Sequence, residues 1–214
     1  MIINTLQDKF LAFLSGIHTA EQRLLEAQQP ILEQASDEIL RRSLQTHNDE
    51  SGQQIETLNQ IFGLLGAEPK PVPSQAVDGL IAEAQEFLQL SQGDPVLLDC
   101  VIADLQGKVE HFEIACYREL VLGAQALGHQ PIIDLLQQNL RQEDRAAVAI
   151  ETVAAQLLEK ARVDSGKGAS ETETAGERVA ENPAPPLNVT NTGENLDETA
   201  VRAQNEQETE GGGL

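Results

Sequence analysis

The chain has 214 residues and a net charge of −21, from 35 acidic and 14 basic side chains. Charge of this sign repels nucleic-acid phosphates and anionic lipid headgroups, so we expect neither nucleic acid nor a membrane surface as a partner. Tryptophan is absent, there is one tyrosine, and Leu, Gln, Ala and Glu dominate, which is a composition typical of α-helices.

Two features indicate a cytoplasmic protein. The first residues show no signal-peptide pattern, and no apolar run approaches the roughly 20 residues that span a bilayer. The two cysteines, Cys100 and Cys116, lie too far apart along one predicted helix to form a disulfide. Unpaired thiols are typical of the reducing cytoplasm.

The first half of the chain predicts two long helices and one short one. Ser36 is predicted to cap the second long helix, and Gly66 to end it. A short helix is predicted over residues 76–90, after a proline-rich stretch that cannot be helical. The first helix is predicted over residues 5–33, with apolar positions Phe10, Phe13, Leu14, Ile17, Leu24 and Leu25 at helical spacing.

The second half predicts two more long helices. Asp94 before Pro95 predicts the start of one of them, and Gly128 its end. Pro131 is predicted to open the other. Short connections make each pair of long helices antiparallel, whereas the connection between the pairs is long enough to cross the bundle. The expected fold class is therefore all-α: a ferritin-like antiparallel four-helix bundle whose long crossover contains a short helix.

The composition changes sharply after Arg162. Residues 163–214 contain no aromatic side chain and carry 11 acids against 3 bases. Such a segment buries too little apolar surface to offset the entropy lost on ordering. We therefore predict a bundle over residues 1–162 and an acidic disordered tail over residues 163–214, whose partner the sequence does not identify.

Polar side chains interrupt the apolar face of every predicted long helix. A single glutamate on such a face is ordinarily a residue at the edge of the bundle, but here the interruptions fall near the middle of all four helices. The interrupting residues are Glu21 in the first helix, His47 with Glu50 in the second, Glu110 with Glu113 in the third and Glu143 in the fourth.

Several carboxylates in one core would repel each other, and no lysine or arginine lies on these faces at matching height. Divalent cations remove the difficulty, because five glutamates and one neutral histidine around two such ions leave a charge of about −1. Oxygen-rich ligation with some imidazole suits iron or manganese. The sequence therefore predicts two divalent metal ions, Fe or Mn, in the core.

With these residues in this order, the chain resembles the YciF-like family of bacterial stress proteins, which is part of the ferritin-like superfamily. The resemblance covers residues 8–160 and none of the tail. Its most specific segment is Val109–Tyr117. The other matching segments are Ala20–Leu25, His47 with Glu50, Gly79–Glu83, and Leu140 with Gln142 and Glu143.

The resemblance implies a homodimer and a pair of metals in each chain. Family members usually carry acids at the positions of Gln142 and Glu143, and tend to have another acid where Ala147 stands. These departures predict a weaker or lopsided site in the fourth long helix. The metal ligands that the resemblance implies are Glu21, His47, Glu50, Glu110, Glu113 and Glu143.

Two functions from different classes follow. As an enzyme, the protein would use a dinuclear iron or manganese centre to react with peroxide or dioxygen. Tyr117 could then hydrogen-bond a bound ligand, although we expect its hydroxyl at the bundle edge. As a non-catalytic stress protein, the chain would be structural or protective and carry a degenerate metal site.

Overall fold

The computed structural model of the chain describes residues 2–172, which contain helices and, within that range, no β-strand. The expectation of an all-helical fold is therefore confirmed for this part of the chain. None of the described helices is long and apolar enough to cross a membrane. In chain order the helices are α1 (Leu6–Gln34), α2 (Glu38–Leu65), α3 (Gln75–Leu90), α4 (Pro95–Leu127) and α5 (Gln130–Thr172).

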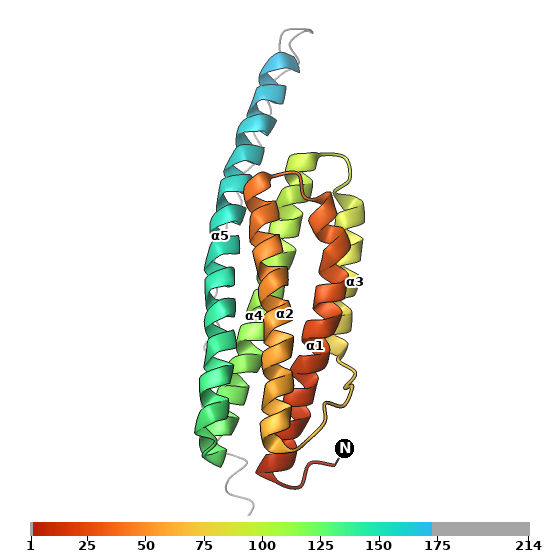
Figure 1. The fold of residues 1–214 in the computed structure, drawn as a ribbon. Helices are drawn as coiled ribbons and strands as arrows, with labels where there is room; N and C mark the ends of the chain where they lie inside the picture. Colours follow the sequence, from red (N-terminus) through yellow and green to blue (C-terminus); the bar gives the residue numbers. More distant parts are fainter. Residues whose placement is uncertain (1, 173–214) are drawn as a thin grey trace, which may run out of the picture. The chain divides into compact units, whose positions relative to one another are not determined.

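The four longest helices lie side by side, with α1 and α5 running in one direction and α2 and α4 in the other (Figure 1). Helix α1 packs against α2 and α4, and α5 packs against the same two helices. Helix α3 packs against α1 and α4 and connects the end of α2 to the start of α4.

Local chemistry explains most of the helix ends. The Asp94 side chain accepts hydrogen bonds from the backbone N–H groups of Val96 and Leu97, so the predicted start of α4 is confirmed. Gly66 and Gly128 end α2 and α4 with φ angles of 60° and 73°. Glycine adopts this left-handed conformation without the steric cost that a Cβ atom brings.

The predicted cap of α2 is wrong by one residue. Asp37, not Ser36, accepts hydrogen bonds from the first backbone N–H groups of the helix. The reason is a tertiary contact, because Ser36 donates its backbone N–H to Asp99 Oδ1 at 2.8 Å and its hydroxyl to Asp99 Oδ2 at 2.6 Å. This buried aspartate of α4 anchors the turn between α1 and α2.

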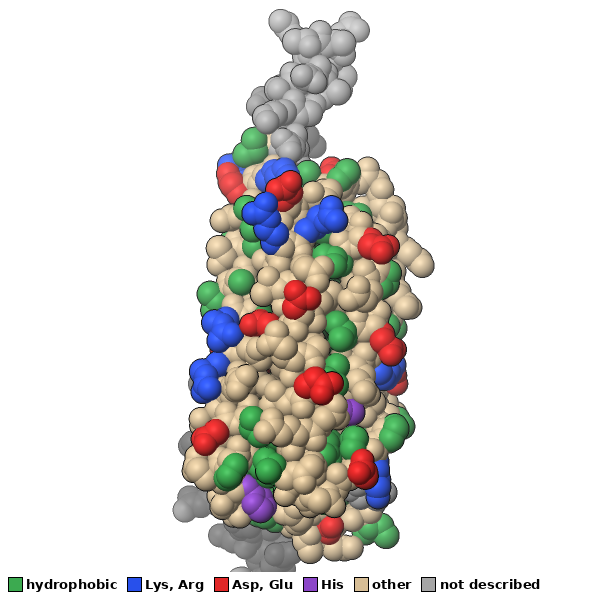
Figure 2. All heavy atoms as spheres, viewed as in Figure 1, with side chains coloured by type: hydrophobic (Ala, Val, Ile, Leu, Met, Phe, Trp, Pro, Cys, Tyr) green, Lys and Arg blue, Asp and Glu red, His purple; other side chains and the backbone are tan. Residues whose placement is uncertain are grey.

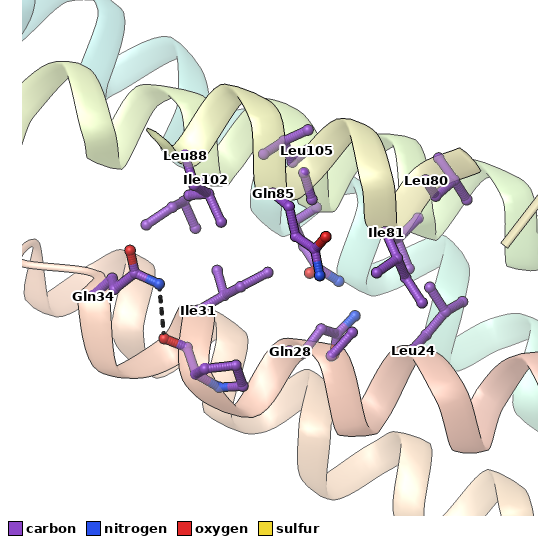
Figure 3. A pocket seen from close by; sticks show the side chains of 15 residues that line it. Leu24, Gln28, Ile31, Gln34, Leu80, Ile81, Gln85, Leu88, Ile102 and Leu105 are labelled. Carbon is purple, nitrogen blue, oxygen red and sulfur yellow. Dashed lines mark hydrogen bonds between the residues drawn. The ribbon is translucent and has the colours of Figure 1, made fainter. Parts of the chain in front are cut away.

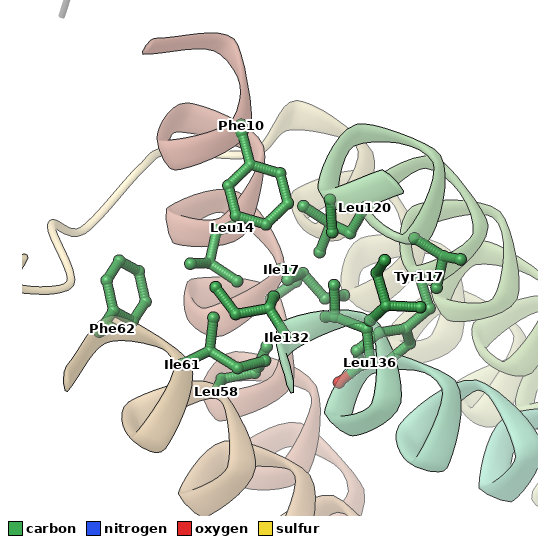
Figure 4. Packing of buried hydrophobic residues seen from close by; sticks show 14 of the residues in the cluster. Phe10, Leu14, Ile17, Leu58, Ile61, Phe62, Tyr117, Leu120, Ile132 and Leu136 are labelled. Atoms are coloured by element: carbon green, nitrogen blue, oxygen red, sulfur yellow. The ribbon is translucent and has the colours of Figure 1, made fainter. Parts of the chain in front are cut away.

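The apolar core is divided into two clusters. Figure 4 shows part of the first hydrophobic cluster, in which Phe10 and Leu14 of α1 meet Leu58 of α2 and Leu136 of α5. The predicted core residue Phe13 is not in it, because its side chain is 40% exposed. The second hydrophobic cluster is centred on Leu40, Leu44, Leu88, Ile102, Leu105, Ile150, Val153 and Leu157.

Polar side chains separate the two clusters along α2 and α5. In α2, His47, Ser51 and Gln54 are buried between Leu44 of the second cluster and Leu58 of the first. In α5, the buried polar residues fall between Leu136 and Ile150 in the same way. We call this set the polar layer; its members are Glu21, Gln28, His47, Ser51, Gln54, Gln106, Glu110, Glu113, Asn139, Gln142 and Glu143.

Helix α5 continues past the predicted boundary at Arg162 and is described as far as Thr172. The predicted start of the disordered tail therefore does not coincide with the end of this helix. The rest of the predicted tail, residues 173–214, lies outside the described residues. The division of the chain at residue 162 stays a prediction.

Candidate metal centre

His47 of α2 lies at the centre of the polar layer, with its side chain 4% exposed. Its Nδ1 is 3.2 Å from Glu110 Oε1, and its Nε2 is 4.0 Å from Glu113 Oε2. Both carboxylates come from α4, where three-residue spacing places them on the same face of the helix. The imidazole therefore lies against two carboxylates that the neighbouring helix supplies.

Glu143 of α5 completes a compact group. One ligand atom from each of His47, Glu110, Glu113 and Glu143 lies within 4.8 Å of all the others. All four side chains are buried. Three helices thus bring together an imidazole nitrogen and three carboxylates at a spacing that suits a metal ion.

Glu21 of α1 is a fourth buried carboxylate and is 0% exposed, but it lies outside this compact group. Burial raises the pKa of Glu21 well above its ordinary value, and the nearby charge of Glu143 adds to the shift. Glu21 also adds to the raised pKa values of Glu113 and Glu110. It is therefore an electrostatic neighbour of the other three carboxylates.

Burial changes the protonation of the whole group. It raises the pKa of Glu110 to about 10 and that of Glu113 well above the usual value, with nearby carboxylates adding to both shifts. It lowers the pKa of His47 to about 4, so the imidazole is neutral at pH 7. A neutral imidazole is the form that binds metals, and the carboxyl groups hold protons that a cation can displace.

Most oxygens of the four buried glutamates have no hydrogen-bond partner. Both oxygens of Glu113, and one each of Glu21, Glu110 and Glu143, are buried without a hydrogen-bond partner. Within residues 2–163, no lysine or arginine side chain is buried. On the surface visible in Figure 2, by contrast, acidic side chains lie among basic ones. Buried charges are normally paired or bound to metals, so these acids match a metal-binding donor set.

Glu50, the sixth predicted ligand, does not join the compact group. Its Oε1 accepts a hydrogen bond at 3.1 Å from Nη2 of Arg145, and its side chain remains 21% exposed. Glu50 and Arg145 border a recess of about 300 Å³ that His47 and Glu110 also line. Glu50 therefore lies on a route between the surface and the candidate metal centre.

Several buried amides, which the sequence patterns do not identify, contact the side chains of the candidate metal centre. Gln54 donates to Glu143 Oε1, and Gln106 donates to Glu110 Oε1 at 2.8 Å. The Nε2 atom of Gln28 lies 3.3 Å from His47 Nε2. Glutamines on helices are usually solvated, so only burial distinguishes these from the many other glutamines of the chain.

The expected position of the Tyr117 hydroxyl is wrong. Tyr117 is 0% exposed, and its hydroxyl donates to Glu21 Oε1 at 2.6 Å rather than reaching the bundle edge. The same hydroxyl accepts a hydrogen bond from Asn139 Nδ2 at 3.1 Å. The ring belongs to the first hydrophobic cluster, and Figure 4 shows it beside Leu136. Tyr117 thus ties that cluster to the polar layer.

The two departures from the family pattern both lie in the core. Gln142 is 7% exposed and its Oε1 has no hydrogen-bond partner, while Ala147 is 3% exposed. Helix α5 therefore contributes one buried acid, Glu143, and one amide oxygen. An amide oxygen is a neutral donor that oxygen-binding metals accept.

The family model described as "Domain of unknown function (DUF892)" matches residues 5–162. The chain belongs to the DUF892 family. The match spans α1 to α4 and the part of α5 that carries Glu143. It therefore includes every residue of the candidate metal centre.

Relatives of this DUF892 chain are similar over nearly their whole length. Protein YciF of Escherichia coli K12 is 30% identical over 161 residues, which are 75% of this chain and 96% of that protein. The crystal structure of the E. coli stress protein YciF superposes with a TM-score of 0.70 at 29% identity, covering 74% of this chain and 99% of that one.

Two further solved structures match. YcfI of Rhodopseudomonas palustris, whose suggested role is structural, has a TM-score of 0.68 at 39% identity and covers 70% of this chain and 95% of that one. A Xanthomonas campestris protein has a TM-score of 0.57 at 20% identity, covers 74% of this chain and 99% of that one, and shows the fold alone.

Proposed function

We propose that this chain is a YciF-like stress protein in which a ferritin-like four-helix bundle of α1, α2, α4 and α5 holds two divalent metal ions. Glu113 carries the proposal, because it is 1% exposed and neither of its oxygens has a hydrogen-bond partner. A side chain in this state destabilises the metal-free fold and gains its partners only when a cation binds.

The proposed ligands are the buried acids and the buried histidine. When the four buried glutamates are ionised they carry −4, which equals the charge of two divalent ions in magnitude. Glu50 is not needed for this balance, since Arg145 already neutralises it. The proposed ligand set is Glu21, His47, Glu110, Glu113 and Glu143.

Supporting residues orient these ligands. Gln54, Gln106 and Tyr117 each donate to one oxygen of a glutamate and leave its other oxygen free. Such outer contacts fix the direction of a ligand and tune its basicity. The arrangement supports a site that is shaped before metal arrives.

The donor set favours iron or manganese, because it is mostly carboxylate with one imidazole. When bound, these metals would supply redox chemistry toward peroxide or dioxygen. The recess between α2, α4 and α5 admits molecules of that size to His47 and Glu110, and Glu50 and Arg145 at its edge would meet them first.

A structural role without catalysis is the second candidate. Gln142 and Ala147 replace acids that the family usually carries, and Glu50 is paired with Arg145. The suggested structural role of the Rhodopseudomonas relative YcfI also favours it. In this case the metal ions would stabilise the bundle and no turnover would follow.

Reconstitution tests the proposed metal site. The protein is purified, loaded with Fe(II) or Mn(II) and freed of excess metal, and its metal content is measured by mass spectrometry. We expect about two ions per wild-type chain, fewer in Glu113→Gln, and wild-type content in the control Glu56→Gln, which changes an exposed acid of α2. Equal metal content in Glu113→Gln and wild type would falsify the ligand assignment.

Peroxide consumption by the loaded protein separates the two candidate functions. Turnover that disappears in Glu113→Gln supports the enzyme, whereas a loaded protein without turnover supports the structural role. We also propose a homodimer, for which the family resemblance is the support. Sedimentation equilibrium checks it, and a monomer at all concentrations would contradict it.

A further inference from the structure

A second cavity lies on the other side of the polar layer, among α1, α3 and α4 (Figure 3). Its volume is about 200 Å³, and none of its lining residues is charged. Gln34 and Gln85 are exposed and border its mouth, whereas Gln28 and Gln106 are buried at its inner side. The aliphatic lining comprises Leu24, Ile31, Leu80, Ile81, Leu88, Ile102, Leu105 and Val109.

Gln28 brings one unsatisfied polar atom to this cavity. Its side chain is 6% exposed and reaches from α1 into the space that α3 and α4 border (Figure 3). The amide Nε2 of Gln28 lies 3.3 Å from His47 Nε2, whereas Gln28 Oε1 is buried without a hydrogen-bond partner.

We propose that this cavity binds a small neutral molecule with an apolar body and one hydroxyl group, such as a substituted phenol. Cavities of about 150 Å³ with aliphatic linings hold a benzene ring, so the volume suits one ring with a substituent. The uncharged lining disfavours ions. The hydroxyl of the ligand donates to Gln28 Oε1, which satisfies the one buried acceptor that the side chain leaves open.

The bound molecule lies one side chain away from the candidate metal ligands. Gln28 contacts His47, and Gln106, which also lines the cavity, donates to Glu110 Oε1. A role for this molecule as a substrate of the metal centre rests on the proposed function, but its binding does not. The test therefore uses metal-free protein, so that failure of the metal site leaves the result on the cavity intact.

Calorimetric titration with p-cresol and with toluene tests the hydroxyl contact, because the two probes have the same ring and methyl group. In Gln28→Met, which keeps the length of the side chain, we expect p-cresol to bind roughly 5- to 10-fold more weakly and toluene to bind as in wild type. Equal weakening of both probes, or no binding of p-cresol to wild type, overturns the proposal.

Filling the cavity tests its location. Ala84 is half-buried on α3 and lines the cavity, whereas Ala82 on the same helix is exposed and does not. Ala84→Phe should lose at least tenfold in affinity for both probes, and the control Ala82→Phe should bind them as wild type does. Circular dichroism checks that each variant is folded, and Gln28→Met provides a second test if Ala84→Phe is not. A folded Ala84→Phe that binds p-cresol normally overturns the proposal.

Discussion

Two buried acids of α4 have opposite surroundings. Asp99, at the turn between α1 and α2, is 0% exposed and accepts three hydrogen bonds, from Ser36 N, Ser36 Oγ and Asp37 N. Glu113, in the polar layer, is 1% exposed and accepts none. Asp99 thus receives hydrogen bonds from the fold on both of its oxygens, whereas Glu113 receives none.

This difference separates a structural acid from a functional one. A buried carboxylate with several donors stabilises the fold, because its hydrogen bonds replace those it made to water. A buried carboxylate without donors lowers the stability of the metal-free fold and is retained where a ligand needs it. From this comparison we expect Asp99 to stabilise the turn between α1 and α2, and we propose that the polar layer serves metal binding.

Removing the carboxylate of Asp99 should have the largest effect on the free energy of unfolding. Asp99→Ala removes the buried acceptor of three hydrogen bonds from Ser36 and Asp37, just before the start of α2, so we expect the free energy of unfolding to fall by about 2–3 kcal/mol. Chemical denaturation measures the change. The control Asp104→Ala, at an exposed position of the same helix, should stay within about 0.5 kcal/mol of wild type. Equal losses in both variants would contradict the structural role of Asp99.

The polar layer should make the metal-free protein less stable as the pH rises. Glu110 holds its proton up to about pH 10 in the folded state, whereas in the unfolded chain it loses that proton near its ordinary pKa of 4.5. Native protein therefore binds more protons than unfolded protein, and stability falls with pH by about 1.4 kcal/mol per pH unit for each proton retained.

The pH window follows from the histidine. Burial lowers the pKa of His47, so unfolded protein takes up a proton at this residue before folded protein does. His47 therefore lowers the free energy of unfolding only as the pH falls from its ordinary pKa of 6.5 toward about 4. Between about pH 6.5 and 8, which lies above the titration of His47 and below that of the thiols, the carboxyl groups of the layer then dominate the slope. Urea denaturation of metal-free wild type and Glu110→Gln across this window should show a smaller decline in the variant. Stability that rises with pH in metal-free wild type would contradict these protonation states.

Replacing Glu113 with a neutral side chain should change the free energy of unfolding in the opposite direction to Asp99→Ala. We expect metal-free Glu113→Gln to be more stable than wild type by about 1–2 kcal/mol at pH 8, because folding no longer requires a proton or buries an unpaired charge. Glu56→Gln, at an exposed site of α2, should be unchanged. A large loss of stability in Glu113→Gln would place Glu113 in the same class as Asp99.

Tyr117→Phe should have the smallest effect on the free energy of unfolding. It removes one hydrogen bond to Glu21 and one from Asn139 but keeps the packed ring, so we expect a loss of about 1 kcal/mol in unfolding free energy. Metal binding should weaken roughly tenfold, since the hydroxyl orients Glu21 rather than binding metal. Metal titration of the folded variant checks this. A variant that binds metal as wild type does would show that the hydroxyl does not position Glu21.

The helices were predictable because their signals are local. Asp94 before Pro95, and the glycines that end α2 and α4, act within a few residues, and the structure has each of them where the sequence places it. Ser36 shows the limit of such signals. Its hydroxyl could cap a helix like that of any serine, but it donates a hydrogen bond to Asp99, which is distant in the sequence.

The candidate site was predictable in part for the same reason. Helical periodicity identifies Glu21, His47 and Glu113 as inward-facing, and all three are buried. Periodicity does not show which residue of another helix lies opposite, so it missed the pairing of Glu50 with Arg145. The buried glutamines were missed because their side chains give no apolar signal.

Anomalous diffraction from crystals soaked in Mn(II) or Fe(II) tests the central claim most directly. Data collected on both sides of the metal absorption edge place each ion without reference to the protein atoms. The account predicts two peaks in the polar layer, with Glu113 and Glu143 in contact with metal. Crystals with peaks only at surface acids, or with none in the polar layer at saturating metal, would contradict it.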